Sequence, residues 1–138
     1  MKKIAIVNGV NLGELGTREV NIYGTLEFET YFEMLRQRFP LFELHYFQSN
    51  SLTEIVNYLL TNKTMDGFIL NPGAYTHQSI VLADTLNTIS QKVVEVHISN
   101  LFNRETYRRK SLIASACTGT ITGFGLKSYD LALFSFMD

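Results

Sequence analysis

The chemically capable residues of this chain gather where runs of apolar residues end. The clearest case is Val94–Ser99, in which apolar residues alternate with Glu95, His97 and Ser99. Successive side chains of a strand point to opposite faces, so these three polar side chains share one face. A carboxylate that binds one imidazole nitrogen fixes the tautomer and raises the histidine pKa, which suits a general acid. A structural pair, in which Glu95 satisfies a nearby backbone or basic group, explains the pattern equally well.

A second candidate is the loop that contains Asn11, Arg18 and Tyr23, where Gly13, Gly16 and Gly24 would let the backbone close over a site. Tyrosine is a poor base near neutral pH because its ordinary pKa is about 10, but a neighbouring guanidinium stabilises the phenolate and lowers that pKa. Arg18 could do this for Tyr23. From spacing alone, a surface arginine beside a packed aromatic ring is the simpler interpretation.

Polar residues also follow the other apolar runs, at Asn8–Asn11, Gln48–Asn50 and Asn71–His77. Turn chemistry explains Asn8, Gly9, Pro72 and Gly73. It does not explain two histidines and an arginine–tyrosine pair. Because ligands of open parallel sheets bind beyond the carboxyl ends of the strands, these segments predict a small-molecule site.

The elements that must position these residues alternate along the chain. Short, nearly continuous apolar runs predict strands at Ile4–Val7, Phe42–Phe47, Phe68–Leu70, Val93–Ile98 and Thr118–Thr122. Helical spacing predicts helices after Thr25, after Ser51 (with Glu54 in a capping box), over Thr76–Ser90 and over Tyr129–Met137. This order favours an α/β fold, a flavodoxin-like doubly wound five-stranded parallel sheet in a three-layer α/β/α arrangement.

Composition limits the classes of function. A chain of 138 residues fits one domain, residues 1–138. Its net charge of -1 gives no electrostatic basis for binding nucleic acid or an anionic membrane. No apolar run is long enough for a signal peptide or a membrane span, so we expect a cytoplasmic protein. The single cysteine, Cys117, cannot form an internal disulfide and is expected to be a small buried side chain.

One rival is a flavodoxin-like module that binds a flavin or nucleotide at the same strand ends without catalysis. The spacing of Gly9, Gly13 and Gly16 matches neither the dinucleotide fingerprint nor the phosphate loop. His45, within the second predicted strand, is expected to be a packed or edge histidine.

Taken together, five segments closely resemble the type II 3-dehydroquinate dehydratases: Asn8–Glu19, Ile22–Gly24, Gln48–Asn50, Asn71–His77 (NPGAYTH) and Glu95–Asn100 (EVHISN). The resemblance covers nearly the whole chain in the right order. It implies a flavodoxin-like enzyme that removes water from 3-dehydroquinate to give 3-dehydroshikimate, in the shikimate pathway or in quinate catabolism. It further implies that no metal or cofactor is needed.

The resemblance also implies roles for individual residues. Tyr23 would be the base, and Arg18 would make its hydroxyl acidic enough to ionise to the phenolate. Asn11 would help hold the water that stabilises the enolate oxygen. His97, oriented by Glu95, would protonate the departing hydroxyl. The expected substrate-binding residues are Asn71, Ile98 and Ser99 for the carboxylate, His77 and Arg108 for the ring hydroxyls, and Asp84, which would reach a neighbouring subunit's site. Family members usually assemble trimers into a homododecamer.

Overall fold

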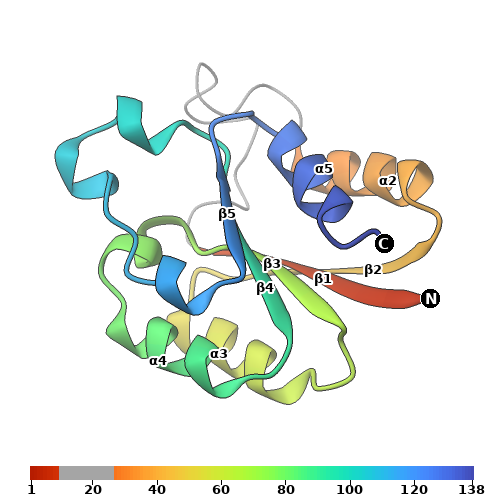
Figure 1. Ribbon diagram of the computed structural model, residues 1–138, viewed down its shortest axis with the longest axis horizontal. Coiled ribbons are helices and arrows are strands. Elements are labelled where there is room, and N and C mark those ends of the chain that lie inside the picture. Colours follow the sequence, from red (N-terminus) through yellow and green to blue (C-terminus); the bar gives the residue numbers. More distant parts are fainter. Residues whose placement is uncertain (10–26) are drawn as a thin grey trace.

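The computed structural model of the chain describes residues 1–9 and 27–138, and its centre is a parallel sheet (Figure 1). The strands are β1 (Lys2–Asn8), β2 (Phe42–Gln48), β3 (Gly67–Asn71), β4 (Lys92–His97) and β5 (Gly119–Thr122). Their order in the sheet is β2-β1-β3-β4-β5, and every neighbouring pair is parallel. This is the flavodoxin-like order, in which the winding reverses between β1 and β3. The predicted fold class and all five predicted strands are confirmed.

Helices cover both faces of the sheet. They are α2 (Phe28–Arg38), α3 (Leu52–Thr61), α4 (Ile80–Thr88) and α5 (Lys127–Phe134), accompanied by short 3-10 helices η2 (Gly73–His77), η3 (Leu101–Asn103), η4 (Thr106–Arg108) and η5 (Ala114–Ala116). Figure 1 shows α2 and α5 on one side of the strands and α3 and α4 on the other. In the described part of the chain, no helix is long and apolar enough to cross a bilayer.

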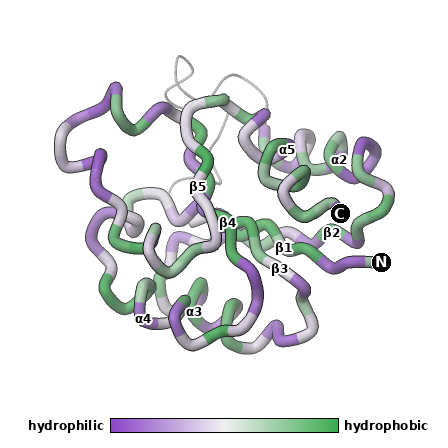
Figure 2. Tube along the Cα trace, viewed as in Figure 1, coloured by the Kyte–Doolittle hydropathy of each residue, from purple (hydrophilic) through white to green (hydrophobic). Residues whose placement is uncertain are grey.

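The two faces of the sheet bury two separate apolar cores. In β1, Ile4 and Ile6 pack with α2 and α5, whereas Ala5 and Val7 pack with α3 and α4. This alternation follows from the two-residue period of a strand. Because both faces are buried, the central strands are mainly apolar, and Figure 2 shows green over much of β1, β3 and β4.

One predicted helix start and half of one predicted helix cap need correction. The predicted helix over Thr76–Ser90 is divided, because residues up to His77 form η2 and α4 begins only after Ser79, whose hydroxyl accepts a hydrogen bond from the Leu82 amide at 3.0 Å. The Ser51 cap is confirmed, since its hydroxyl accepts from the Glu54 amide at 3.3 Å. The other half of the predicted capping box is wrong: the Glu54 carboxylate bonds the Ser49 hydroxyl.

Gly9 holds the ends of β1 and β3 together. Its amide donates to the Asn71 carbonyl at 2.7 Å, and its backbone packs directly against the β3 exit. A Cβ atom at this position would lie 2.4 Å from the Pro72 carbonyl oxygen. That oxygen belongs to the backbone and cannot move aside cheaply, so only glycine fits.

We therefore expect Gly9→Ala to destabilise the protein by about 1–3 kcal/mol, because the added methyl group must push two strand ends apart. Gly119→Ala in β5 is the matched control, since a Cβ there meets nothing within 4 Å. Urea unfolding should show the loss for Gly9→Ala only, and equal effects of the two substitutions would contradict this account.

Candidate active site

A carboxylate and an imidazole are buried together at the carboxyl end of β4. Glu95 is 0% exposed and His97 is 4% exposed. The Glu95 Oε2 atom bonds His97 Nε2, and Thr120 on the neighbouring β5 donates its hydroxyl to Glu95 Oε1 at 3.3 Å. Burial of an unpaired carboxylate would be costly, so these partners are what allow Glu95 to stay inside. The contact leaves Nδ1 as the nitrogen of His97 that does not face Glu95.

His77 lies beside this pair. Its ring is 6.2 Å from that of His97, centroid to centroid, and inclined by 27°. The Nδ1 atom of His77 is 2.8 Å from the Lys110 carbonyl oxygen. A carbonyl can only accept, so Nδ1 carries a hydrogen, and in the neutral ring Nε2 is an acceptor.

The turn after β3 explains why His77 reaches this place. Gly73 has a φ of 65°, in the left-handed region that glycine adopts without strain. The Asn71 Oδ1 atom accepts from the Gly73 amide at 3.3 Å, an asparagine turn that ends the strand. The chain then forms η2, which is tied down by the bond from the Leu112 amide to the Thr76 carbonyl at 2.9 Å.

Burial lowers the pKa of His77 below its ordinary value of 6.5. The hydrogen bond to Lys110 acts in the opposite direction, and the charges of His97 and Arg108 lower the pKa of His77 further. The Glu95 charge raises it. Four of the residues singled out in the sequence, Glu95, His97, His77 and Arg108, are therefore close enough to influence one another.

Arginines from the segment after β4 line the same region. The Arg108 Nε atom lies 3.0 Å from a carboxylate oxygen of Glu105, one turn earlier. Arg104, which the sequence analysis passed over, donates from Nη1 to the Ser99 hydroxyl at 3.3 Å. The signal that could have identified Arg104 is its place in the loop directly after the polar end of β4.

Asn71 lies at the reversal point of the sheet and is buried. Its Nδ2 atom donates to the Tyr129 hydroxyl at 2.9 Å, and that hydroxyl donates to Asn8 Oδ1 at 2.8 Å. The turn interpretation of Asn8 is wrong, because Asn8 is the last residue of β1 and its side chain is fully buried. The Ile98 side chain belongs to the core shared with α2 and α5, so only its backbone could meet a ligand.

Of the remaining predicted residues, the structure describes Asp84 alone. Asp84 is on α4 and exposed, and within the described ranges no hydrogen bond or ion pair links it to either histidine. Asn11, Arg18 and Tyr23 lie outside the described residues.

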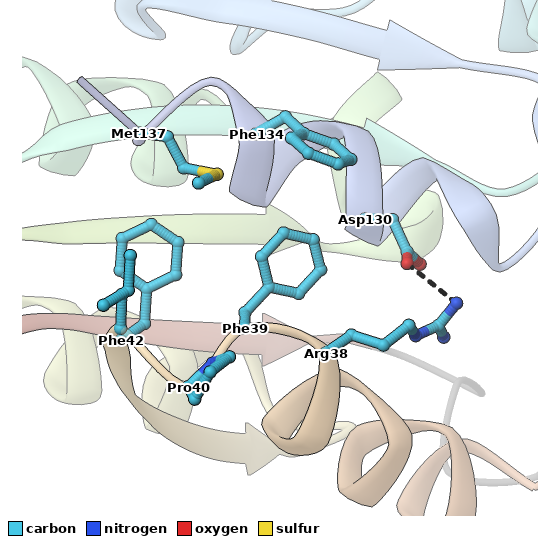
Figure 3. Close-up of a pocket in the computed structure, with 8 residues that line it drawn as sticks. Arg38, Phe39, Pro40, Phe42, Asp130, Phe134 and Met137 are labelled. Atoms are coloured by element: carbon cyan, nitrogen blue, oxygen red, sulfur yellow. Dashed lines mark ion pairs between the residues drawn. The ribbon is translucent and has the colours of Figure 1, made fainter.

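A pocket of about 310 Å³ lies away from these residues, at the ends of α2 and α5. Figure 3 shows apolar side chains around it, among them Phe39, Phe42 and Phe134, with the Arg38–Asp130 ion pair at one side. Arg38 and Asp130 neutralise each other, so the pocket lacks the convergent polar groups of the strand-end site.

His45 is an edge histidine, as expected, and bonds Glu43 at 2.6 Å in the outer strand β2.

The fold and this site define a flavodoxin-like α/β enzyme with a buried carboxylate–imidazole pair at its strand ends. The sequence profile described as "Dehydroquinase class II" matches residues 2–137. A 3-dehydroquinate dehydratase of Caldicellulosiruptor bescii is 44% identical over 98% of this chain and 96% of its own length. The type II dehydroquinase structure from Butyrivibrio crossotus matches with a TM-score of 0.94 and 39% identity, over 97% of this chain and 96% of its own. The type II dehydroquinase structure from Propionibacterium acnes matches with a TM-score of 0.93 and 35% identity, over 99% of this chain and 96% of its own. The chain belongs to the class II dehydroquinase family.

The lowered pKa of His77 gives a pH prediction. In the unfolded chain His77 has its ordinary pKa, so between that value and the lower folded value the unfolded state binds more protons. The free energy of unfolding therefore falls as pH drops below about 6.5. We expect the NMR titration midpoint of His77 to lie below 6.5, and His77→Gln to lose less stability than the wild type between pH 8 and pH 5. A midpoint at or above 6.5 would refute this.

Proposed function

We propose that the protein catalyses the reversible dehydration of 3-dehydroquinate to 3-dehydroshikimate, in the shikimate pathway or in quinate catabolism. Membership of the class II dehydroquinase family supports this proposal. So do relatives named 3-dehydroquinate dehydratase that align over nearly their full length. The observation in this chain that carries the proposal is the buried Glu95–His97 pair at the carboxyl end of β4.

The proposed reaction is a stepwise anti elimination. Tyr23, kept ionised as the phenolate by Arg18, takes a proton from the carbon next to the ketone. The electron pair of the broken C–H bond then forms an enolate, with its negative charge on the ketone oxygen. Asn11 helps hold the water that stabilises this oxygen. When the enolate collapses, a carbon–carbon double bond forms and the carbon–oxygen bond to the leaving hydroxyl breaks. His97 protonates that hydroxyl, which departs as water.

The orientation of His97 supports its role as the acid. Glu95 holds Nε2, so a donated proton would leave from Nδ1, the nitrogen turned away from the carboxylate. Glu95 is itself held by Thr120 and by complete burial, which keeps the ring in one orientation. A ring positioned before the reaction has little reorganisation to undergo during proton transfer.

For substrate binding, we propose that Asn71, the backbone at Ile98 and the Ser99 hydroxyl bind the carboxylate. His77 and Arg108 would bind the ring hydroxyls. The tautomer of His77 supports this, because a neutral ring with its hydrogen on Nδ1 presents Nε2 as an acceptor for a hydroxyl proton.

We expect the purified protein to convert 3-dehydroquinate into the conjugated product, measured as rising ultraviolet absorbance, without added metal. Glu95→Gln should lower kcat by about 100-fold or more, because the neutral amide changes the hydrogen bond that orients His97 and general acid–base catalysis contributes about 10²–10⁴-fold.

Glu43→Gln provides a matched control. It alters a second glutamate–histidine pair, which has the same two-residue spacing on a strand but lies partly exposed on β2. Its turnover should equal that of the wild type. Absence of wild-type turnover across neutral pH would contradict the proposed activity, and full activity of Glu95→Gln would remove the pair from the mechanism.

We also propose that the protein forms a homododecamer of trimers in which Asp84 acts at a neighbouring subunit's site. Ile80, one helical turn before Asp84 on α4, is 69% exposed, and the adjacent Val81 is 58% exposed. Two large aliphatic side chains beside a carboxylate are what a subunit contact would cover.

We expect Ile80→Arg to dissociate the trimer and to lower activity, because a charge placed in an apolar contact is costly to bury. Met34→Arg, on the exposed side of α2 across the sheet, should leave the assembly intact. Light scattering coupled to size-exclusion chromatography gives both masses. An unchanged mass for Ile80→Arg would show that this face of α4 lies outside the contact.

A further inference from the structure

We propose that Tyr129 is a positioning residue that fixes the Asn71 side-chain amide with its NH2 group available to the substrate carboxylate. This inference rests on the proposed function, because it assigns a direction to a group proposed above to bind substrate. Tyr129 belongs to α5, on the α2 side of the sheet, and its side chain is fully buried.

Tyr129 reaches the point where the winding of the sheet reverses. Asn8 and Asn71 are paired in the register of β1 and β3, and both continue the strand faces that pack against α2 and α5. The tyrosine hydroxyl bonds both amides. Its ring is held by Phe28, at a centroid distance of 4.8 Å and an angle of 62°. One side chain from the last helix therefore joins two strand ends that lie far away in the sequence.

The direction of every bond in this chain of groups follows from one backbone amide. The Gly73 N–H can only donate, so the Asn71 atom facing it must be the oxygen, Oδ1. Nδ2 of Asn71 then faces Tyr129, whose hydroxyl must accept there. The hydroxyl has one proton, and it goes to Oδ1 of Asn8.

This direction matters for recognition of a carboxylate. The amide nitrogen of Asn71 carries two hydrogens, and the bond to Tyr129 uses one of them. The second remains for an anionic ligand. An Asn71 amide turned the other way would direct its oxygen toward the carboxylate and would leave buried groups unsatisfied. Without the hydroxyl, the Asn71 amide would keep the longer bond from Gly73, at 3.3 Å, but would lose its partner at 2.9 Å, so it could turn toward Asn8.

The test is Tyr129→Phe, which removes the hydroxyl and keeps the ring. We expect KM for 3-dehydroquinate to rise about tenfold or more, the range for losing one hydrogen bond to a charged group, while kcat changes less than about threefold. In an Asn71→Ala background the same substitution should leave KM unchanged, because no amide remains to be positioned.

Tyr31→Phe is the matched control. Tyr31 lies in the same core, and its hydroxyl donates to Asp130 without meeting Asn8 or Asn71. It should affect the free energy of unfolding but not KM. Should Tyr129→Phe fail to fold, Asn8→Leu gives the second test. It removes the acceptor of the Tyr129 proton, so that hydroxyl can donate again only if the Asn71 amide turns its oxygen toward it. KM should therefore rise although the tyrosine remains.

Each outcome separates the two proposals. If the wild type is active and Tyr129→Phe leaves KM unchanged, the proposed role of Tyr129 is overturned and the proposed function stands. Additive effects of Tyr129→Phe and Asn71→Ala on KM would have the same meaning. A fall in unfolding free energy with no change in KM would make Tyr129 purely structural. Absence of wild-type turnover would overturn the proposed function and this role with it.

Discussion

The structure of the site depends on one constraint, which is that Glu95 has no contact with solvent. A carboxylate inside a protein must be paired or hydrogen-bonded, because its desolvation is otherwise too costly. His97 and Thr120 meet this need, and both are placed by the sheet: His97 two residues along the same strand, and Thr120 directly opposite in β5. The parallel register thus fixes a carboxylate, an imidazole and a hydroxyl in one arrangement without any loop contributing.

Most of the fold could be predicted because periodicity records burial. The strands β1, β3 and β4 are mostly buried on both faces and contain nearly continuous apolar runs. All five strands were predicted to within a few residues. The start of α4 could not be predicted in this way. The stretch from Thr76 has residues compatible with a helix, but Gly73 turns the chain and the Lys110 and Leu112 contacts hold the following residues as a 3-10 helix. Those partners are remote in sequence, so no local pattern reveals them.

For the site as well, features that depend on neighbouring residues could be predicted, and features that depend on residues remote in the sequence could not. The shared face of Glu95 and His97 was visible in the sequence because it depends only on the period of a strand. The position of His77 beside His97 depends on the order of strands in the sheet. The role of Asn8 was missed, because an asparagine before a glycine is a common turn sequence. Only the arrival of Tyr129 from the last helix makes Asn8 part of a buried hydrogen-bonded chain.

Two groups of polar side chains therefore lie at the carboxyl ends of the strands, on opposite faces of the sheet. One contains Glu95, and the other contains Asn8 and Asn71. Glu95 continues the strand face that packs on α3 and α4, whereas Asn8 and Asn71 continue the face that packs on α2 and α5. In the first group Glu95 accepts a hydrogen bond from His97, and in the second the Tyr129 hydroxyl accepts one from Asn71. His97 and Asn71 are therefore each held in one orientation before a ligand binds. Polar groups held in this way need little reorganisation on binding, and that is the physical advantage of building a site on strand ends and not on side chains in solvent.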